Sequence, residues 1–279
     1  MHGLGNDFVV VGVVDALPDH AASLSVQWCD RHFGIGADGV LFVLSGGLPG
    51  QEAPFTMRMF NPDGSEAEMC GNGIRCVASF LRRKGAWQAE ELSVATLAGL
   101  QHLTFRGHTR WEDVVEVDMG RPQLDGLQIP TRHAGAVIDQ PIEAGGRTFA
   151  YTAVSMGNPH AVIFVDDPHA LPLAEVGPQI EHHPDFPQRT NVEFVGFSGN
   201  VLTVDVWERG AGATLACGTG ACAAAVAAAW TGRAPRETQV RLPGGTLQIR
   251  WAEDDHVHMT GPATVVFTGD WPHKEDVSA

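Results

Sequence analysis

The stretch Glu68-Met69-Cys70-Gly71-Asn72-Gly73-Ile74-Arg75-Cys76 places a cysteine directly before a Gly-x-Gly turn and a helical pattern. The pattern continues over residues 74–81, and the cations at residues 82–84 suit the negative end of a helix dipole. Gly85 then suits the position just past a helix C-terminus. The stretch therefore predicts a helix that begins immediately after Cys70.

A second stretch near the other end has the same design, since Ala216-Cys217-Gly218-Thr219-Gly220-Ala221-Cys222 again joins a cysteine, a Gly-x-Gly turn and a helical segment. Alanine-rich residues 221–230 predict that helix, Gly232 suits its end, and Pro235 prevents its continuation. Two cysteines placed alike indicate a duplicated unit. They also suggest two thiols that act on one small molecule from opposite sides.

The composition limits the partners of this chain. It has 279 residues, with 18 Lys and Arg against 33 Asp and Glu and a net charge of −15. This charge repels phosphate backbones and anionic bilayers, so we expect neither a nucleic-acid partner nor a membrane partner. The most apolar run, residues 221–230, is shorter than the ~20 residues that cross a bilayer. Five cysteines, an odd number, fit reduced thiols in the cytoplasm better than a disulfide framework.

Short alternating or β-branched segments at regular spacing predict many strands and few helices. The dipeptide Gly199-Asn200, for example, marks a hairpin between two of them. We therefore predict a mixed α/β (α+β) fold with two pseudo-symmetric halves, each a curled antiparallel β-sheet or barrel around a central helix. The expected parts are an N-terminal half at residues 1–119, a C-terminal half at residues 120–263, and a final strand at residues 264–279 that packs back onto the first half.

The two cysteine turns carry a specific chemistry. A thiol at a helix N-terminus is near unpaired backbone N–H groups, which predicts a pKa lowered from about 8.5 toward neutrality. The same N–H groups can bind a carboxylate. If Cys70 and Cys217 face one another, the α-carbon of a bound amino acid lies between two sulfurs. One sulfur takes a proton while the other gives one, which inverts a stereocentre without a cofactor.

The cysteines could also bind zinc, form a redox centre or pack in the core. Cys217 and Cys222 have a C-x4-C spacing that borders on zinc ligation, but no partnered pair completes a tetrad, and we predict no metal. A dithiol redox centre is disfavoured because C-x-x-C is absent. We interpret Cys29, Cys76 and Cys222 as core residues. A non-catalytic thiol, metal or ligand-binding protein stays open as an alternative from another class.

Six motifs, in the same order, resemble the diaminopimelate epimerase family across nearly the whole chain: residues 1–8, 33–38, 61–76, 156–160, 190–191 and 208–222. The resemblance implies an isomerase that needs no pyridoxal phosphate and interconverts LL- and meso-2,6-diaminopimelate. It also implies a place in lysine and peptidoglycan precursor biosynthesis, a homodimer, and the two-half architecture described above.

The resemblance also implies roles for single residues. Cys70 and Cys217 are similar to the two catalytic thiols of the family, and Glu208 to the group that binds the reacting amine. His160 borders the site, where a packing role is an equal alternative. The reacting carboxylate is expected at Gly71, Asn72, Gly73, Gly218 and Thr219, and the distal amino-acid head at Asn6, Asn61, Asn158, Asn191 and Arg209.

One departure and one alternative follow from the resemblance. Some members have glutamine where this chain has Gly39, so a contact by that side chain is not expected here. A related isomerase of the same fold, such as a proline racemase, is the alternative function. The amides and the Arg209 guanidinium, which suit a second charged head, favour diaminopimelate over a substrate with no distal charge.

Overall fold

The structure is a computed structural model that describes residues 1–272. The first half contains β1 (His2–Gly3), β2 (Asn6–Val14), α1 (Ala21–Cys29), β3 (Gly39–Ser45), β4 (Phe55–Phe60), β5 (Glu66–Ala67), α2 (Gly71–Arg83), β6 (Glu91–Thr96), β7 (Gly99–His108) and β8 (Glu112–Asp118). The remainder contains β9 (Gln140–Ala144), β10 (Arg147–Ser155), β11 (Pro159–Phe164), the 3-10 helix η1 (Pro168–Ala170), α3 (Leu173–Glu181), β12 (Asn191–Ser198), β13 (Val201–Glu208), β14 (Gly212–Thr214), α4 (Gly218–Trp230), β15 (Glu237–Leu242), β16 (Gly245–Trp251) and β17 (Val257–Thr264).

The strands of the first half form a closed barrel. Neighbouring strands are hydrogen-bonded in the order β1, β2, β3, β4, β6, β7, β8, β17 and back to β1. Strand β17 closes the ring, with His2 opposite Thr264 and Val115 opposite Gly261. Helix α2 packs against β17, β8, β1, β2, β3 and β4, so it fills the barrel.

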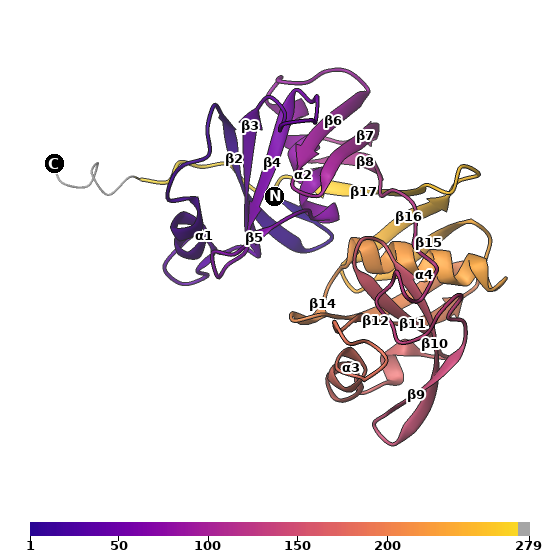
Figure 1. The fold of residues 1–279 in the computed structure, drawn as a ribbon. Coiled ribbons are helices and arrows are strands. Elements are labelled where there is room, and N and C mark those ends of the chain that lie inside the picture. The colour runs from indigo at the N-terminus through magenta and orange to yellow at the C-terminus, as the bar shows by residue number, and fades with distance from the viewer. Residues whose placement is uncertain (273–279) are drawn as a thin grey trace.

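The second half repeats this pattern of pairing (Figure 1). The pairs β1/β2, β2/β3, β3/β4, β4/β6, β6/β7 and β7/β8 correspond to β10/β11, β11/β12, β12/β13, β13/β15, β15/β16 and β16/β17. In both series the first, third, fifth and sixth pairs are antiparallel and the second and fourth parallel. The predicted fold, two pseudo-symmetric halves around central helices, is confirmed.

The parallel pairs correct one part of the prediction, which was that the sheet of each half is antiparallel. A parallel pair needs a crossover connection of a dozen or more residues, and a helix usually provides it. Here α2 connects β4 to β6 and α4 connects β13 to β15. Each central helix is therefore the crossover of a parallel pair, which fixes its N-terminus at the end of a strand.

Composition explains how α4 fits inside its sheet. Its alanines from Ala221 to Ala228 are at most 3% exposed, and the helix packs against β10, β11, β12, β13, β15 and β16. Small side chains allow strands to approach from several sides, and alanine has the best helix propensity. In α2 the corresponding core residues are Ile74, Val77, Ala78 and Leu81, all fully buried.

Strand β17 belongs to both halves. It pairs with β8 along one edge, while the other edge pairs first with β16 over residues 257–260 and then with β1 at Thr264. Figure 1 shows it passing between the two groups of strands. The strand that returns to the first half is thus Val257–Thr264, earlier than the expected 264–279, of which residues 273–279 lie outside the described part. The division at 119/120 stays a proposal, and it falls just after β8.

No helix within residues 1–272 is both long enough and apolar enough to span a bilayer.

Candidate active site

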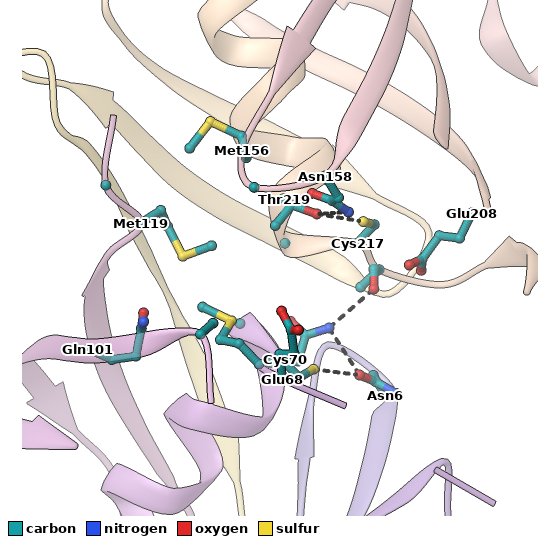
Figure 2. A pocket seen from close by; sticks show the side chains of 18 of the residues that line it. Asn6, Glu68, Cys70, Gln101, Met119, Met156, Asn158, Glu208, Cys217 and Thr219 are labelled. Carbon is teal, nitrogen blue, oxygen red and sulfur yellow. Dashed lines mark hydrogen bonds between the residues drawn. The ribbon is translucent and has the colours of Figure 1, made fainter. Parts of the chain in front are cut away.

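A pocket of about 580 Å³ opens where the N-termini of α2 and α4 meet. Figure 2 shows Cys70 and Cys217 entering it from the two halves of the molecule. The lining residues from the first half are Asn6, Glu68, Met69, Cys70, Gly71, Asn72, Ala98, Gln101 and Met119. Those from the connection and the second half are Gly120, Arg121, Met156, Gly157, Asn158, Glu208, Arg209, Ala216, Cys217, Gly218 and Thr219.

Cys70 is the N-cap residue of α2. Its backbone is extended, and its sulfur accepts a hydrogen bond from the backbone N–H of Gly73 at 3.4 Å. The partly buried thiol also lies 3.9 Å from Oδ1 of Asn6, to which its S–H donates. The sulfur therefore occupies the position that a capping oxygen takes in many helices. The predicted helix start is confirmed.

Cys217 caps α4 in the same way. Its sulfur accepts from the backbone N–H of Gly220 at 3.3 Å, and the Thr219 hydroxyl lies 3.4 Å from it. The residue is 5% exposed. The two cysteine turns that look alike in the sequence are thus alike in geometry, with each thiol bound to the N–H three residues later.

Glycine allows the two helix starts to lie close to one another and to Met259. A Cβ on Gly218 would lie 3.8 Å from the Cα of Gly71 and 3.1 Å from the sulfur of Met259, a residue of the shared β17. A Cβ on Gly71 would lie 3.0 Å from the terminal methyl of Met259. The positive ends of both helix dipoles therefore converge on one pocket, which favours binding of an anion there.

Asn72 connects the halves directly. Its Nδ2 donates to the carbonyl oxygen of Ala216 at 3.2 Å and to Oδ1 of Asn6 at 3.2 Å. Its Oδ1 accepts from a guanidinium nitrogen of Arg75 at 2.9 Å. The amide is consequently held by three partners and has a single orientation.

A buried chain of polar groups leads to Cys217. Asn158 donates from Nδ2 to the Thr219 hydroxyl at 3.3 Å, and its Oδ1 lies 2.9 Å from Nε2 of His160. The other ring nitrogen of His160 lies 2.7 Å from Oε1 of Glu193. His160 and Glu193 are both 0% exposed. His160 therefore contacts Asn158 and not the pocket itself.

Burial raises the pKa of the Cys70 thiol above its ordinary value. Desolvation is the largest cause, the N–H of Gly73 and the charge of Arg75 oppose it, and the charge of Glu208 adds to it. A buried thiolate loses hydration that these groups only partly replace.

The pKa of Cys217 is raised further above its ordinary value. Desolvation is again the largest cause, and the negative charges of Glu208 and Glu193 come next, while Thr219 acts in the opposite direction. The prediction that the helix ends lower both pKa values toward neutrality is therefore wrong, because desolvation outweighs the helix N-terminus at each sulfur.

Four expected site residues do not line the pocket. Gly73 is buried and its N–H is bound to Cys70. Asn61 donates from Nδ2 to Ser65, beyond the end of β4. Asn191 is 4% exposed, and its side chain donates to the carbonyl oxygen of Pro159 and accepts from the N–H of Arg209. The fourth is His160, described above. Gly39 also lies away from the pocket, at the start of β3.

Other lining residues were not predicted from the sequence. Glu68 and Met69 directly precede Cys70, and their position in that stretch could have marked them. Arg121 follows Gly120 in the connection between the halves. A cation next to a glycine in a linker is only a weak sign of a binding residue. Gln101 on β7 and Met119 after β8 carry no signal at all, because strand pairing alone brings them to the pocket.

Two acidic and two basic residues are among those that line this pocket: Glu68, Glu208, Arg121 and Arg209. A ligand with both ammonium and carboxylate groups at each end matches this balance. Within residues 1–272 no group of three or more His, Cys, Asp or Glu side chains has the arrangement of a metal site.

Comparison with known proteins identifies relatives over nearly the full length. The family model for diaminopimelate epimerase matches residues 1–124 and 152–266. The diaminopimelate epimerase of Moorella thermoacetica is 53% identical over 98% of this chain and 98% of its own. That of Synechococcus elongatus is 52% identical over 96% of this chain and 95% of its own.

Solved structures share the fold at low sequence identity. A hydroxyproline epimerase from Agrobacterium vitis superposes with a TM-score of 0.67, 18% identity, and coverage of 95% of this chain and 89% of that one. A phenazine biosynthesis protein of the PhzF family from Bacillus anthracis superposes with a TM-score of 0.66, 17% identity, and coverage of 95% and 93%.

Proposed function

The chain belongs to the diaminopimelate epimerase family, and we propose that it interconverts LL- and meso-2,6-diaminopimelate by moving a proton between two thiols. The observation that carries the proposal is that Cys70 and Cys217 cap two helices whose N-termini border one pocket. A substrate α-carbon bound there has a sulfur available on either face. The enzyme is an isomerase that uses its own side chains for the chemistry.

The reacting carboxylate binds at the paired helix starts. Gly71 and Asn72 on one side, and Gly218 and Thr219 on the other, line the pocket at these helix starts. Two helix N-termini stabilise a carboxylate and also the extra charge that spreads onto it when the α-proton leaves. The N–H groups of Gly73 and Gly220 have a different task, because they hold the two sulfurs.

The remaining polar groups hold the two amines and the distal carboxylate. Glu208 borders both thiols and suits the reacting ammonium. Arg209 suits the distal carboxylate, since a guanidinium binds it through two parallel hydrogen bonds. Asn6 and Asn158 supply amides at the edges of the pocket, and Asn61 and Asn191 join them only if the halves close further on the substrate.

The proton transfer runs in one step on each face. One cysteine is thiolate and removes the α-proton, so that the electron pair of the C–H bond passes to the α-carbon and its carboxylate. The other cysteine is thiol and donates its proton to the opposite face. The sulfurs have then exchanged protonation states, and the product has the inverted configuration.

Both thiols have a raised pKa, so formation of the thiolate costs free energy in the folded enzyme. This is a suitable arrangement for a weak carbon acid, because a thiolate deprived of hydration is a stronger base than one in water.

The experiment is exchange in D2O. Reduced enzyme and LL-diaminopimelate are followed by NMR for loss of the α-proton signal and by mass for deuterium in the meso product. We expect one deuterium per inversion. Proline serves as the competing substrate, and exchange into proline without exchange into diaminopimelate would replace our assignment with a proline racemase. Cys222→Ser, a buried cysteine on the same helix as Cys217, is the matched control and should retain exchange.

We also propose that the protein works in the cytoplasm, as a homodimer, in the supply of lysine and peptidoglycan precursors. The names of the relatives support the pathway. Sedimentation of the purified protein tests the dimer.

A further inference from the structure

Arg75 is a fully buried cation whose partners carry no negative charge. It is 0% exposed and donates to the carbonyl oxygens of Gly71 and Pro262, to Oδ1 of Asn72 and to the sulfur of Met259. None of these contacts, all within residues 1–272, is with a carboxylate. A buried charge is costly unless it is paired, so its location calls for a reason.

The hydrogen-bond partners of the Arg75 guanidinium, at the start of α2, supply the reason. Arg75 lies on α2 one turn after Cys70 and bonds the carbonyl of the first helical residue, Gly71, at 2.9 Å. It also bonds the amide oxygen of Asn72 at 2.9 Å. The guanidinium thus adds a permanent positive charge close to the start of α2, which Cys70 caps. It also directs the Asn72 amino group toward the second half.

The second half has no such charge. Counted from the cysteines, the position of Arg75 in the first turn corresponds to Cys222 in the second. The buried neighbours also differ, because a Cβ on Gly73 would meet Leu41 at 3.1 Å, whereas a Cβ on Gly220 would meet Glu193 at 2.7 Å.

The charged groups that act on the two thiols differ. The carboxylate of Glu208 raises the pKa of Cys70 and the cation of Arg75 lowers it. Cys217 faces Glu208, and Glu193 in its pair with His160. Both Glu208 and Glu193 raise the pKa of Cys217 through their negative charge, whereas Arg75 lowers the pKa of Cys70 through its positive charge. The two sulfurs are equivalent in backbone geometry but not in electrostatics.

We propose that Arg75 is a positioning residue that fixes Asn72 and polarises the paired site, so that Cys70 is the first of the two thiols to lose its proton. The enzyme accordingly meets its substrate with thiolate at Cys70 and thiol at Cys217. The inference rests on the proposed function only for its consequence in turnover, because the order of ionisation belongs to the free protein.

The test measures ionisation without substrate. The reduced protein is alkylated briefly with iodoacetamide between pH 6.5 and 10.5, in ~0.5-unit steps that resolve a one-unit shift, and peptide mass spectrometry gives the rate at each cysteine. The midpoint of each rate profile is compared, because burial changes the rate itself. We expect Cys70 to have a midpoint about one unit or more below that of Cys217. Cys76 and Cys222, both 0% exposed, are internal references for global opening.

Two variants separate charge from packing. Arg75→Met removes the charge at similar length and should raise the Cys70 midpoint by about one unit while leaving that of Cys217 in place. Arg75→Lys keeps the charge but not the fork that holds Asn72, so it should preserve the midpoint and still slow deuterium exchange. If Arg75 had only a structural role, both variants would have the same effect on the Cys70 midpoint and on deuterium exchange.

Several results would overturn the inference. Ionisation of Cys217 first, or equal midpoints in the wild-type protein, would do so even if Arg75→Met did not fold. An unchanged Cys70 midpoint in a folded Arg75→Met protein would do so as well. Absence of any exchange into diaminopimelate together with early ionisation of Cys70 would instead refute the proposed function and leave the role of Arg75 standing.

Discussion

The amide nitrogen of Asn72 lies 3.2 Å from the carbonyl oxygen of Ala216, so a side chain from the first helix start holds the backbone just before the second cysteine. This bond fixes the two helix starts relative to one another. Asn72 therefore stabilises the fold and also lines the pocket, so its replacement should affect both stability and activity.

Asn72→Ala removes the amide from this position. We expect the free energy of unfolding to fall by about 1–3 kcal/mol, because the buried Ala216 carbonyl and the Arg75 guanidinium each lose a partner. Exchange should fall about 100-fold, since the helix starts no longer hold the reacting carboxylate firmly. Urea unfolding and the D2O assay measure the two effects. Asn200→Ala, exposed in the hairpin between β12 and β13, should change neither.

Cys70→Ser and Cys217→Ser assign the two faces. An alcohol is a far weaker acid than a thiol, so epimerisation should fall by about three orders of magnitude or more in each variant. Each variant keeps one thiol and should still exchange the α-proton of one isomer only. The isomer that Cys70→Ser exchanges should be the one that Cys217→Ser does not. Equal residual exchange of LL- and meso-substrate in both variants would contradict two thiols on opposite faces.

The buried thiols predict a loss of stability at high pH. The pKa of Cys76 and Cys222 is raised from 9.0 to about 12 by burial, so the native state keeps these protons after the unfolded chain has begun to release them. The stabilisation is complete below pH 9 and decreases as pH rises from 9 to 12. The slope should reach about 1.4 kcal/mol per pH unit for each thiol.

Urea unfolding under reducing conditions at pH 8, 9 and 10 measures this slope. The control is the double variant Cys76→Ala/Cys222→Ala, whose curve should fall less steeply over the same range whatever its stability at pH 8. An equal slope in the two proteins would show that other groups govern the alkaline loss.

Gly220→Ala tests the close packing under α4. The new Cβ would lie 2.7 Å from Oε1 of Glu193 and 3.3 Å from the sulfur of Cys217, so either the carboxylate or the helix start has to move. We expect exchange to fall by about 10- to 100-fold, because small displacements of a catalytic group are costly. Gly107→Ala on β7, where a Cβ meets nothing within 4 Å, should be neutral.

Sequence patterns predicted the parts of the structure that are local. A cysteine before a Gly-x-Gly turn indicates a helix start, and both α2 and α4 begin one residue after their cysteine. Duplicated motifs also indicated the pseudo-symmetric halves. The parallel pairs could not be predicted in this way, because strand direction depends on where the crossover helix packs and not on the strand's own pattern.

The site was predictable to the extent that its residues adjoin the cysteines. Gln101 and Met119 come to the pocket through pairing of β7 and β8, which no short motif encodes. The direction of the thiol pKa shifts was missed for a related reason. A helix N-terminus is visible in a sequence, whereas the depth of burial that opposes it emerges only when the whole core is assembled.

The shared strand β17 has a consequence for synthesis of the protein on the ribosome. The barrel of the first half closes only when residues 257–264 pair with β8 and β1, yet those residues are made well over a hundred residues after β8, once the strands of the second half have been made. During translation the emerging first half therefore has a gap between β1 and β8, with unpaired backbone groups at both edges. The chain must keep these edges from pairing with other nascent chains until β17 has been made.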